Sequence, residues 1–292
     1  MIVVAKKSAL SRFFGGEGDT RAGRLLDVGH ESVRKWRPAH EQHVRVVELV
    51  CETLEKAGAE TLILHGAQAE FDPVGAQLIV SVGGDGTLLA ASHNISDVPI
   101  LGVNSAPRYS VGFFCAARGA SAMRTLRKAL EQEVPSAQLQ RMAVRINGQL
   151  RSERVLNEAL YCHAEPAATS NYILQLGRRR EEQKSSGFWV GPAAGSTAAL
   201  HSAGGRILPL TSSKLQLVVR EPYVGRGRAP KILRETVSGR ARITAVSKMD
   251  RVSIFLDGPY RLLRARLGDE VTFERSLQPL TVVGLPRPRS GK

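Results

Sequence analysis

Cysteine, aromatic side chains, long apolar runs and negative charge are all scarce in this chain of 292 residues. The cysteines, Cys51, Cys115 and Cys162, are too few and too widely spaced for a disulfide framework or a metal knuckle, which predicts a reducing cytoplasm. No apolar stretch approaches the ~20 residues of a membrane span. The apolar start of the chain ends at Lys6, too early for a signal peptide. We therefore expect a cytoplasmic protein with no membrane partner.

Basic residues outnumber acidic ones by 41 to 27, which gives a net charge of +14. Such a surface favours anionic partners, including nucleotides, polyphosphate and nucleic acid, and charge alone does not choose among them. Aromatic residues make up only 5% of the chain, and no basic stretch is interleaved with stacking aromatics. Since single-stranded nucleic acid is bound by such stacking platforms, we expect no nucleic-acid partner.

The first half of the chain alternates between short apolar runs and helical patterns. Strands are expected at residues 2–5, 61–64, 78–82 and 99–103. Helices are expected from Pro38 to Gly58, from the glycine turn at 83–87 to about Asn94, and around Met123–Leu130. Residues 11–36, rich in glycine and mixed charge, predict a loop. This alternation is typical of an open, Rossmann-like parallel sheet in an α/β domain over residues 1–138.

The pattern changes near residue 140. Residues 141–146 alternate with period two and lead into Asn147-Gly148, a hairpin turn signal. Residues 252–256, 261–267 and 270–274 predict a meander, and the one helix candidate lies around Thr197–Ala203. We therefore predict a mostly antiparallel β domain over residues 139–278. A last strand at 280–283 and a basic tail, expected to be disordered, complete residues 279–292.

A glycine-rich stretch, Gly83-Gly84-Asp85-Gly86-Thr87, stands between an apolar strand and a helix. Glycines let the backbone approach a ligand, and N–H groups at a helix start suit a phosphate. Asp85 is electrostatically awkward among donors that face phosphate. Two interpretations stay open on these residues alone: Asp85 caps the helix, or it accepts a proton or holds a metal.

Four further stretches carry polar groups at element ends, and each has an ordinary structural alternative. Asn104 ends a strand and is soon followed by Gly112-Phe113, or it leads a simple turn. Asn157-Glu158 can bind an adenine edge and a ribose hydroxyl, or it is an exposed strand end. Residues 185–199 run through a small-residue turn into Gly195-Ser196-Thr197. Asp257-Gly258 by itself is an ordinary hairpin turn.

Taken in this order, the stretches resemble the boxes of the NAD kinase family. Its GGDGT box stands at Gly83–Thr87, its Asn-Glu pair at Asn157-Glu158 and its later Asp-Gly at Asp257-Gly258. Its GSTA box and the trailing SAGG stand at Gly195–Ala198 and Ser202–Gly205. Diacylglycerol and sphingosine kinases use a similar GGDGT box, so that box alone is moderately specific. The ordered set is far more specific.

The resemblance implies transfer of the γ-phosphate of ATP, or of a phosphate of polyphosphate, to the 2′-hydroxyl of the adenosine ribose of NAD(H), with Asp85 as general base. It implies Mg²⁺ or another divalent cation bound with ATP, no metal site made by protein alone, and a homo-oligomer, a dimer or tetramer. The residues it implies in nucleotide binding are Gly83, Gly84, Asp85, Gly86, Thr87, Asn104, Phe113, Asn157, Glu158, Ser186, Ala194, Ser196, Thr197, Ala198, Ser202 and Asp257.

Several residues depart from the family pattern. Residues 106–110 interrupt the usual run between Asn104 and Gly112, which looks more like the branch with mitochondrial and NADH-preferring plant members. Ser186 replaces the usual Asp, and Ala199 replaces a Tyr that contacts the dinucleotide. These changes leave open whether the protein prefers NAD⁺ or NADH as its substrate. The alternatives are a lipid kinase with a GGDGT box and a non-catalytic basic protein that binds nucleotides or nucleic acid.

Overall fold

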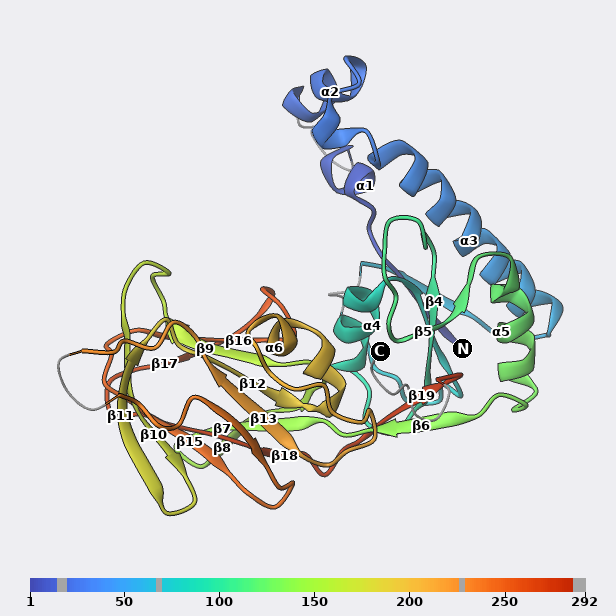
Figure 1. Cartoon of the computed structure of the whole chain (residues 1–292). Coiled ribbons are helices and arrows are strands. Elements are labelled where there is room, and N and C mark those ends of the chain that lie inside the picture. Colours follow the sequence, from blue (N-terminus) through green and yellow to red (C-terminus); the bar gives the residue numbers. More distant parts are fainter. Residues whose placement is uncertain (15–19, 67–69, 226–228, 286–292) are drawn as a thin grey trace. The chain divides into compact units, whose positions relative to one another are not determined.

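The structure, a computed structural model, describes residues 1–14, 20–66, 70–225 and 229–285 (Figure 1). The chain divides into two compact units. The first unit comprises Met1–Ala137 and the segment that begins at Thr281; the second comprises Gln138–Leu280. Each unit has a hydrophobic core of its own.

The first unit is built on a seven-stranded sheet of order β2-β1-β3-β4-β19-β6, with β5 paired to β4. The pairs β1–β2, β1–β3, β3–β4, β4–β5 and β4–β19 are all parallel, which confirms the predicted open α/β sheet. The expected strands are present, whereas β5 and β6 were not predicted. The strands are β1 Ile2–Ala5, β2 Leu62–His65, β3 Ile79–Gly83, β4 Ile100–Asn104, β5 Cys115–Arg118, β6 Ser136–Leu139 and β19 Leu280–Val283.

Helices connect these strands. They are α1 Ala9–Phe14, α2 Thr20–Asp27, η1 Glu31–Val33, α3 Trp36–Lys56, α4 Asp85–Ser92, η2 Gly119–Ser121 and α5 Ala122–Leu130. Buried side chains of α3 and α5, such as Val50 and Leu126, share one core cluster with Val80 of β3. Figure 1 shows α1 and α2 beside the beginning of α3.

The predicted loop over residues 11–36 is wrong in its described part, because α1, α2 and η1 occupy much of it. One of the glycines that suggested a loop there, Gly29, terminates a helix. Gly29 has φ +63°, its N–H donates to Leu26 O at 3.1 Å, and the N–H of His30 donates to Leu25 O at 2.8 Å. These two bonds form a Schellman motif, which satisfies the last carbonyls of α2.

The second unit is a sandwich of two six-stranded sheets, of order β11-β10-β15-β18-β7-β8 and β14-β13-β12-β9-β16-β17. The pairs within them are antiparallel, as predicted for the second half of the chain. The inner faces share one core, in which the rings of Tyr161 and Phe188 stack with centroids 4.8 Å apart.

The elements of this unit begin at residue 142. They are β7 Met142–Ile146, β8 Gln149–Val155, β9 Ala159–His163, β10 Ser170–Leu176, β11 Arg179–Ser185, β12 Phe188–Pro192, η3 Ala193–Thr197, α6 Ala199–Ser202, β13 Leu215–Val219, β14 Arg234–Val237, β15 Ile243–Ser247, β16 Val252–Leu256, β17 Arg261–Ala265 and β18 Glu270–Arg275.

The predicted meander of β16, β17 and β18 is wrong in its last step. β16 and β17 form a hairpin, but β18 pairs with β15 and β7 of the other sheet. The turn at Gly268-Asp269 therefore carries the chain from one sheet to the other. Val271 and Phe273 of β18 are buried in the shared core, and this burial selects the pairing.

Two further expectations concern the C-terminal tail and membrane-spanning segments. The disordered tail expected at its end lies, from residue 286 on, outside the described residues. In the part of the chain that the structure describes, no helix has the length and apolar character needed to cross a membrane.

Candidate functional site

The glycine turn between β3 and α4 is tightly packed on one side and open on the other. A Cβ on Gly83 would lie 2.2 Å from Thr87 Oγ1, and one on Gly84 would lie 2.3 Å from Ser110 Oγ. At Gly83 a side chain would clash with the whole of the Thr87 side chain, whereas at Gly84 the clash is with a hydroxyl that can rotate. A Cβ on Gly86 would meet no atom within 4 Å, and Gly86 is exposed. The open side of the turn can receive a ligand close to the backbone.

Asp85 is the first residue of α4, and it does not cap the helix. The N-cap is Gly84, and no side chain makes a cap hydrogen bond there. Instead the carboxylate of Asp85 accepts the N–H of Phe113 at Oδ2 and the N–H of Phe114 at Oδ1, each at 2.8 Å. The capping interpretation is therefore wrong. Asp85 is half-buried and held by a segment far along the chain.

The loop after β4 supplies those two donors, and Asn104 shapes it. Asn104 is fully buried; its Nδ2 donates to Ser110 O at 3.0 Å, and its Oδ1 accepts the N–H of Ala106 at 3.2 Å. Gly112 has φ +61°, and a Cβ there would lie 2.3 Å from Asn104 Nδ2. Asn104 thus positions the loop that brings Phe113 to Asp85. The first unit gathers the predicted residues Gly83–Thr87, Asn104 and Phe113 in one place.

In the second unit the carboxylate of Asp257 likewise holds a backbone segment by accepting its N–H groups. It lies in the β16–β17 turn at φ +50°, and its carboxylate accepts backbone N–H groups from Leu156 at 2.9 Å, Asn157 at 2.7 Å and Glu158 at 3.2 Å. Its own N–H donates to Glu158 O at 3.0 Å. The Asp-Gly turn is therefore more than a hairpin connection, because it fixes the backbone of the Asn-Glu pair.

The GSTA box packs directly on that pair. A Cβ on Gly195 would lie 1.8 Å from Asn157 O, and one on Gly191 would lie 2.2 Å from the same atom. Within the box, Ser196 is buried; its Oγ donates to Ala193 O at 2.7 Å and accepts the N–H of Leu208 at 3.0 Å. The predicted residues of this segment differ in exposure: Ala194 and Ser196 are buried, Ala198 is half-exposed, and Thr197 and Ser202 are exposed.

Two side-chain oxygens of the Asn-Glu pair are buried without a hydrogen-bond partner among the described residues: Asn157 Oδ1 and Glu158 Oε2. Burial and the nearby charge of Asp257 raise the pKa of Glu158 to about 8, against the opposing effect of the Ala199 N–H. Since unsatisfied buried polar atoms are costly, both oxygens are candidate ligand contacts: Asn157 Oδ1 as an acceptor, and Glu158 Oε2 as a donor when that carboxyl is protonated and as an acceptor when it is ionised.

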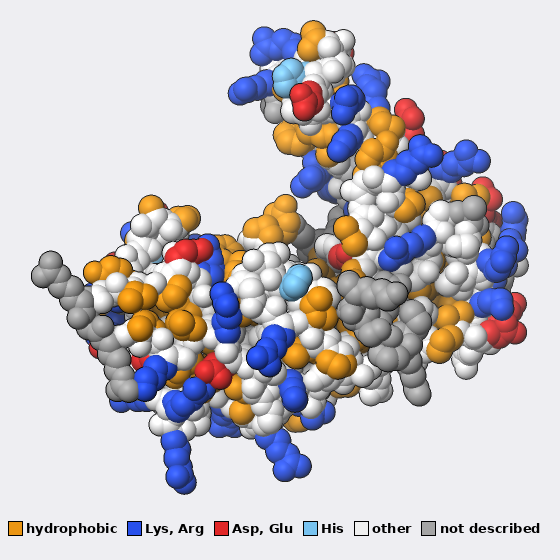
Figure 2. Space-filling view, viewed as in Figure 1, with side chains coloured by type: hydrophobic (Ala, Val, Ile, Leu, Met, Phe, Trp, Pro, Cys, Tyr) orange, Lys and Arg blue, Asp and Glu red, His pale blue; other side chains and the backbone are white. Residues whose placement is uncertain are grey.

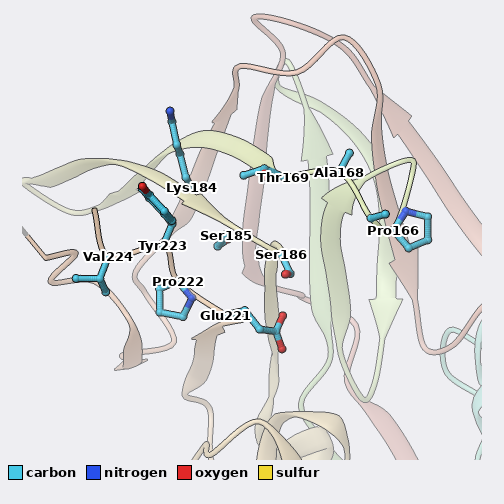
Figure 3. Close-up of a pocket in the computed structure, with 11 residues that line it drawn as sticks. Pro166, Ala168, Thr169, Lys184, Ser185, Ser186, Glu221, Pro222, Tyr223 and Val224 are labelled. Carbon is cyan, nitrogen blue, oxygen red and sulfur yellow. The ribbon is translucent and has the colours of Figure 1, made fainter. Parts of the chain in front are cut away.

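Ser186 lies elsewhere in the second unit, at the end of β11. It lines a cavity of about 560 Å³, a volume within the range of small-molecule sites. In Figure 3, Lys184 and Tyr223 lie on one side of Ser185 and Ser186, and Pro166 and Ala168 lie on the other. Arg220 donates from its guanidinium to Ser186 O at 3.3 Å, so a cation stands beside this residue.

The sequence did not single out every residue that builds these groups. The N–H donor of Phe114, the carbonyl of Ser110 and the close approach of Gly191 became visible only in the structure. The one local signal was the glycine–aromatic pair Gly112-Phe113. In the described residues, no three His, Cys, Asp or Glu side chains are grouped so that they could hold a metal ion.

Known proteins resemble this chain in sequence and in fold. The model of the ATP-NAD kinase N-terminal domain matches residues 30–134. A probable NADH kinase of Oryza sativa is 33% identical over 228 residues, with 70% of each chain covered. An NADH kinase of Arabidopsis thaliana is 29% identical over 267 residues, covering 82% of this chain and 83% of its own.

A crystal structure of an NAD kinase from Archaeoglobus fulgidus in complex with ATP has a similar fold. Its TM-score is 0.66 at 20% sequence identity, over 96% of this chain and 92% of that one. The chain has a parallel α/β unit with a GGDGT turn and a two-sheet β unit with the Asn-Glu and GSTA boxes, and its relatives place it among the phosphotransferases. The chain belongs to the NAD kinase family.

Proposed function

We propose that this protein transfers the γ-phosphate of ATP to the 2′-hydroxyl of the adenosine ribose of NAD(H), which yields NADP(H). The observation that carries the proposal is the carboxylate of Asp85, held by the N–H groups of Phe113 and Phe114 within the glycine turn. These two bonds fix the direction of the side chain, and each carboxylate oxygen retains a further lone pair.

The donor would bind at the glycine turn. Phosphoryl transfer depends mainly on positioning and charge neutralisation, and the N–H groups of Gly84 and Gly86 at the start of α4 would contribute to both. Mg²⁺ would arrive with the donor, as the ATP–Mg²⁺ complex, and neutralise part of the phosphate charge. ATP and polyphosphate are both chemically suitable donors.

Asp85 would accept the proton of the 2′-hydroxyl as that oxygen attacks the γ-phosphorus. An ordinary aspartate has a pKa of ~3.9 and is a weak base, so proton transfer should be late in the reaction. The bond from the γ-phosphorus to the bridging oxygen breaks, and its electron pair stays on the β-phosphate.

The dinucleotide would bind through the second unit. The unpartnered oxygens of Asn157 and Glu158 are suited to the adenine amine and a ribose hydroxyl. Thr197, Ala198 and Ser202 would line the same surface, and Asp257 and Ser196 would hold it in shape. The cavity beside Ser186 is proposed for the nicotinamide half, where an uncharged serine offers nothing to the positive ring of NAD⁺.

A homo-oligomer, dimer or tetramer, and residence in the cytoplasm belong to the same proposal. All three cysteines are free, as a reducing compartment requires. Size-exclusion chromatography with light scattering measures the oligomeric state, and fractionation of the producing cells locates the protein.

The central test uses purified protein, ATP–Mg²⁺ and either NAD⁺ or NADH, with chromatographic detection of NADP⁺ or NADPH. Parallel samples receive polyphosphate in place of ATP, or diacylglycerol in place of the dinucleotide. We expect NADP(H) with ATP and no lipid phosphate. Absence of product from both dinucleotides, with a folded protein, would overturn the proposal.

A further inference from the structure

Two cations, Lys6 and Arg12, lie near the carboxyl end of β1 without a carboxylate partner among the described residues. Lys6 directly follows β1 and is half-buried, and Arg12 lies on α1. In the described part of the chain, neither forms an ion pair with a carboxylate at 4.0 Å or less. In open α/β sheets, ligands bind beyond the carboxyl ends of the strands. This is therefore where an anion would be expected.

A ring of hydrogen bonds fixes Lys6 beside the glycine turn. The N–H of Lys6 donates to Val82 O at 3.0 Å, one residue before Gly83. The carbonyl of Lys6 accepts from His43 Nε2 at 3.0 Å, so the proton is on that nitrogen and His43 Nδ1 accepts from Ser105 Oγ at 2.9 Å. The N–H of Ser105 closes the ring on Gly83 O at 3.0 Å. The backbone of Lys6 is thus tied to the turn through both its N–H and its carbonyl.

Among the described residues, the charge that acts most on the Lys6 ammonium is positive. Burial and the charge of Arg12 lower the pKa of the Lys6 ammonium. Burial, followed by Lys6, His40 and His65, lowers the pKa of His43 to about 4. Figure 2 shows further Lys and Arg side chains over the neighbouring α1–α2 segment. Lys6 is half-buried and Arg12 is exposed. A partly desolvated ammonium close to a second positive charge destabilises a fold unless an anion offsets the charge.

Both residues precede the segment that the family model matches, which begins at residue 30. A role for them is therefore inferred from the contacts and charges described above.

We propose that Lys6 and Arg12 form a second phosphate subsite, next to the glycine turn, that binds the leaving phosphates of the donor. The inference rests on the proposed function. When the bond between the γ-phosphorus and the bridging oxygen breaks, the β-phosphate gains a negative charge, and the 2′-hydroxyl proton passes to Asp85. The ammonium and guanidinium groups offset the charge on the leaving group, which is ADP from ATP or a shortened chain from polyphosphate.

Inorganic tripolyphosphate, titrated calorimetrically at 150 mM salt, tests the subsite without turnover. The variants are Lys6→Met and Arg12→Met. Matched controls are Lys56→Met, at the far end of α3, and Arg127→Met, on α5; both remove one exposed charge from the same unit. We expect Kd to rise at least tenfold in the two variants and to stay within twofold in the controls. Unchanged binding in both variants would overturn the proposal.

Kinetics and stability sharpen the test. KM for ATP should rise at least fivefold in Lys6→Met while KM for NADH stays within twofold. The same assay with long-chain polyphosphate as the donor shows whether phosphate transfer from polyphosphate depends on Lys6 and Arg12. Removal of an uncompensated ammonium should leave the melting temperature equal or higher; a fall with normal tripolyphosphate binding would mean a structural role only. Loss of tripolyphosphate binding in a protein that makes no NADP(H) would refute the proposed function and leave the subsite standing.

Discussion

Asp85 in the first unit and Asp257 in the second each hold a loop through its backbone N–H groups. Asp85 accepts two such bonds, from residues 113 and 114, and Asp257 accepts three, from residues 156–158. Both aspartates lie in glycine-bearing turns. Each thereby positions a neighbouring group that a ligand can reach.

The surroundings of the two aspartates differ. Asp85 opens a helix in a turn whose far side, at Gly86, is free of packing. Asp257 takes a left-handed conformation and stands beside Glu158, a buried carboxyl whose pKa its charge helps to raise to about 8. Under the proposed function, the same pattern of hydrogen bonds would serve chemistry at Asp85 and recognition at Asp257, and single substitutions should separate the two roles.

The largest effect is expected for Asp85→Asn. The amide cannot accept the 2′-hydroxyl proton, so kcat should fall by roughly 10²–10⁴-fold. The amide also places an N–H₂ against the N–H of Phe113 or Phe114, so some loss of stability is expected as well. The measurement is the rate of NADP(H) formation together with the melting temperature.

Asp269→Asn is the matched control for that structural cost. Asp269 likewise accepts a backbone N–H, that of Arg266 at 2.7 Å, but in an exposed turn of the second unit. It should lose little activity. If Asp85→Asn turned over like the wild type while correctly folded, Asp85 would not be the base.

Substitution of Asp257 should weaken binding of the dinucleotide more than that of ATP. Asn tolerates the left-handed backbone and keeps one acceptor oxygen, whereas Ala keeps none and leaves three N–H groups unpaired. We expect melting temperatures in the order wild type, Asp257→Asn, Asp257→Ala, with the last losing on the order of 2–3 kcal/mol. KM for NADH should rise from wild type through Asp257→Asn to Asp257→Ala. Equal KM values for NADH in all three proteins would contradict the role assigned to Asp257.

The two units should respond to pH in opposite directions. His43 has a folded pKa of about 4, below its ordinary 6.5, so its contribution to stability is present above pH 6.5 and lost as pH falls toward 4. Glu158 has a folded pKa of about 8, above its ordinary 4.5, so its contribution is present below pH 4.5 and lost as pH rises toward 8.

Melting temperatures of two variants across pH 4.5–8.5 test this contrast. Glu158→Gln should be as stable as the wild type at pH 4.5. At pH 8.5 its free energy of unfolding should be higher by on the order of 2 kcal/mol, which raises its melting temperature. His43→Gln should remove the acid-side loss of stability. Parallel curves for variant and wild type would show that the residue titrates normally in the folded protein.

The sequence was informative where signals are local. The strand–turn–helix around Gly83–Thr87 and the period-two strands from Arg141 could be predicted because burial and turn chemistry repeat over a few residues. The partners of Asp85 and Asp257 could not be, since they lie 28 and about 100 residues away. For the same reason Asp85 was equally consistent with a cap, and β18 was assigned to the wrong sheet.

The smallest effect is expected at Ser186, and it concerns the choice of dinucleotide. Asp at this position would place a negative charge at the cavity proposed for the nicotinamide ring, which is positive in NAD⁺ and neutral in NADH. Arg220, which already bonds to Ser186 O, would offset part of that charge. The ratio of kcat/KM for NAD⁺ to that for NADH should therefore rise only about three- to tenfold, or ~1 kcal/mol. Ser238→Asp adds the same charge at an exposed position of the same unit and should leave the ratio unchanged; an equal shift in both variants would mean that the general field of the unit, and not the cavity, distinguishes the two dinucleotides.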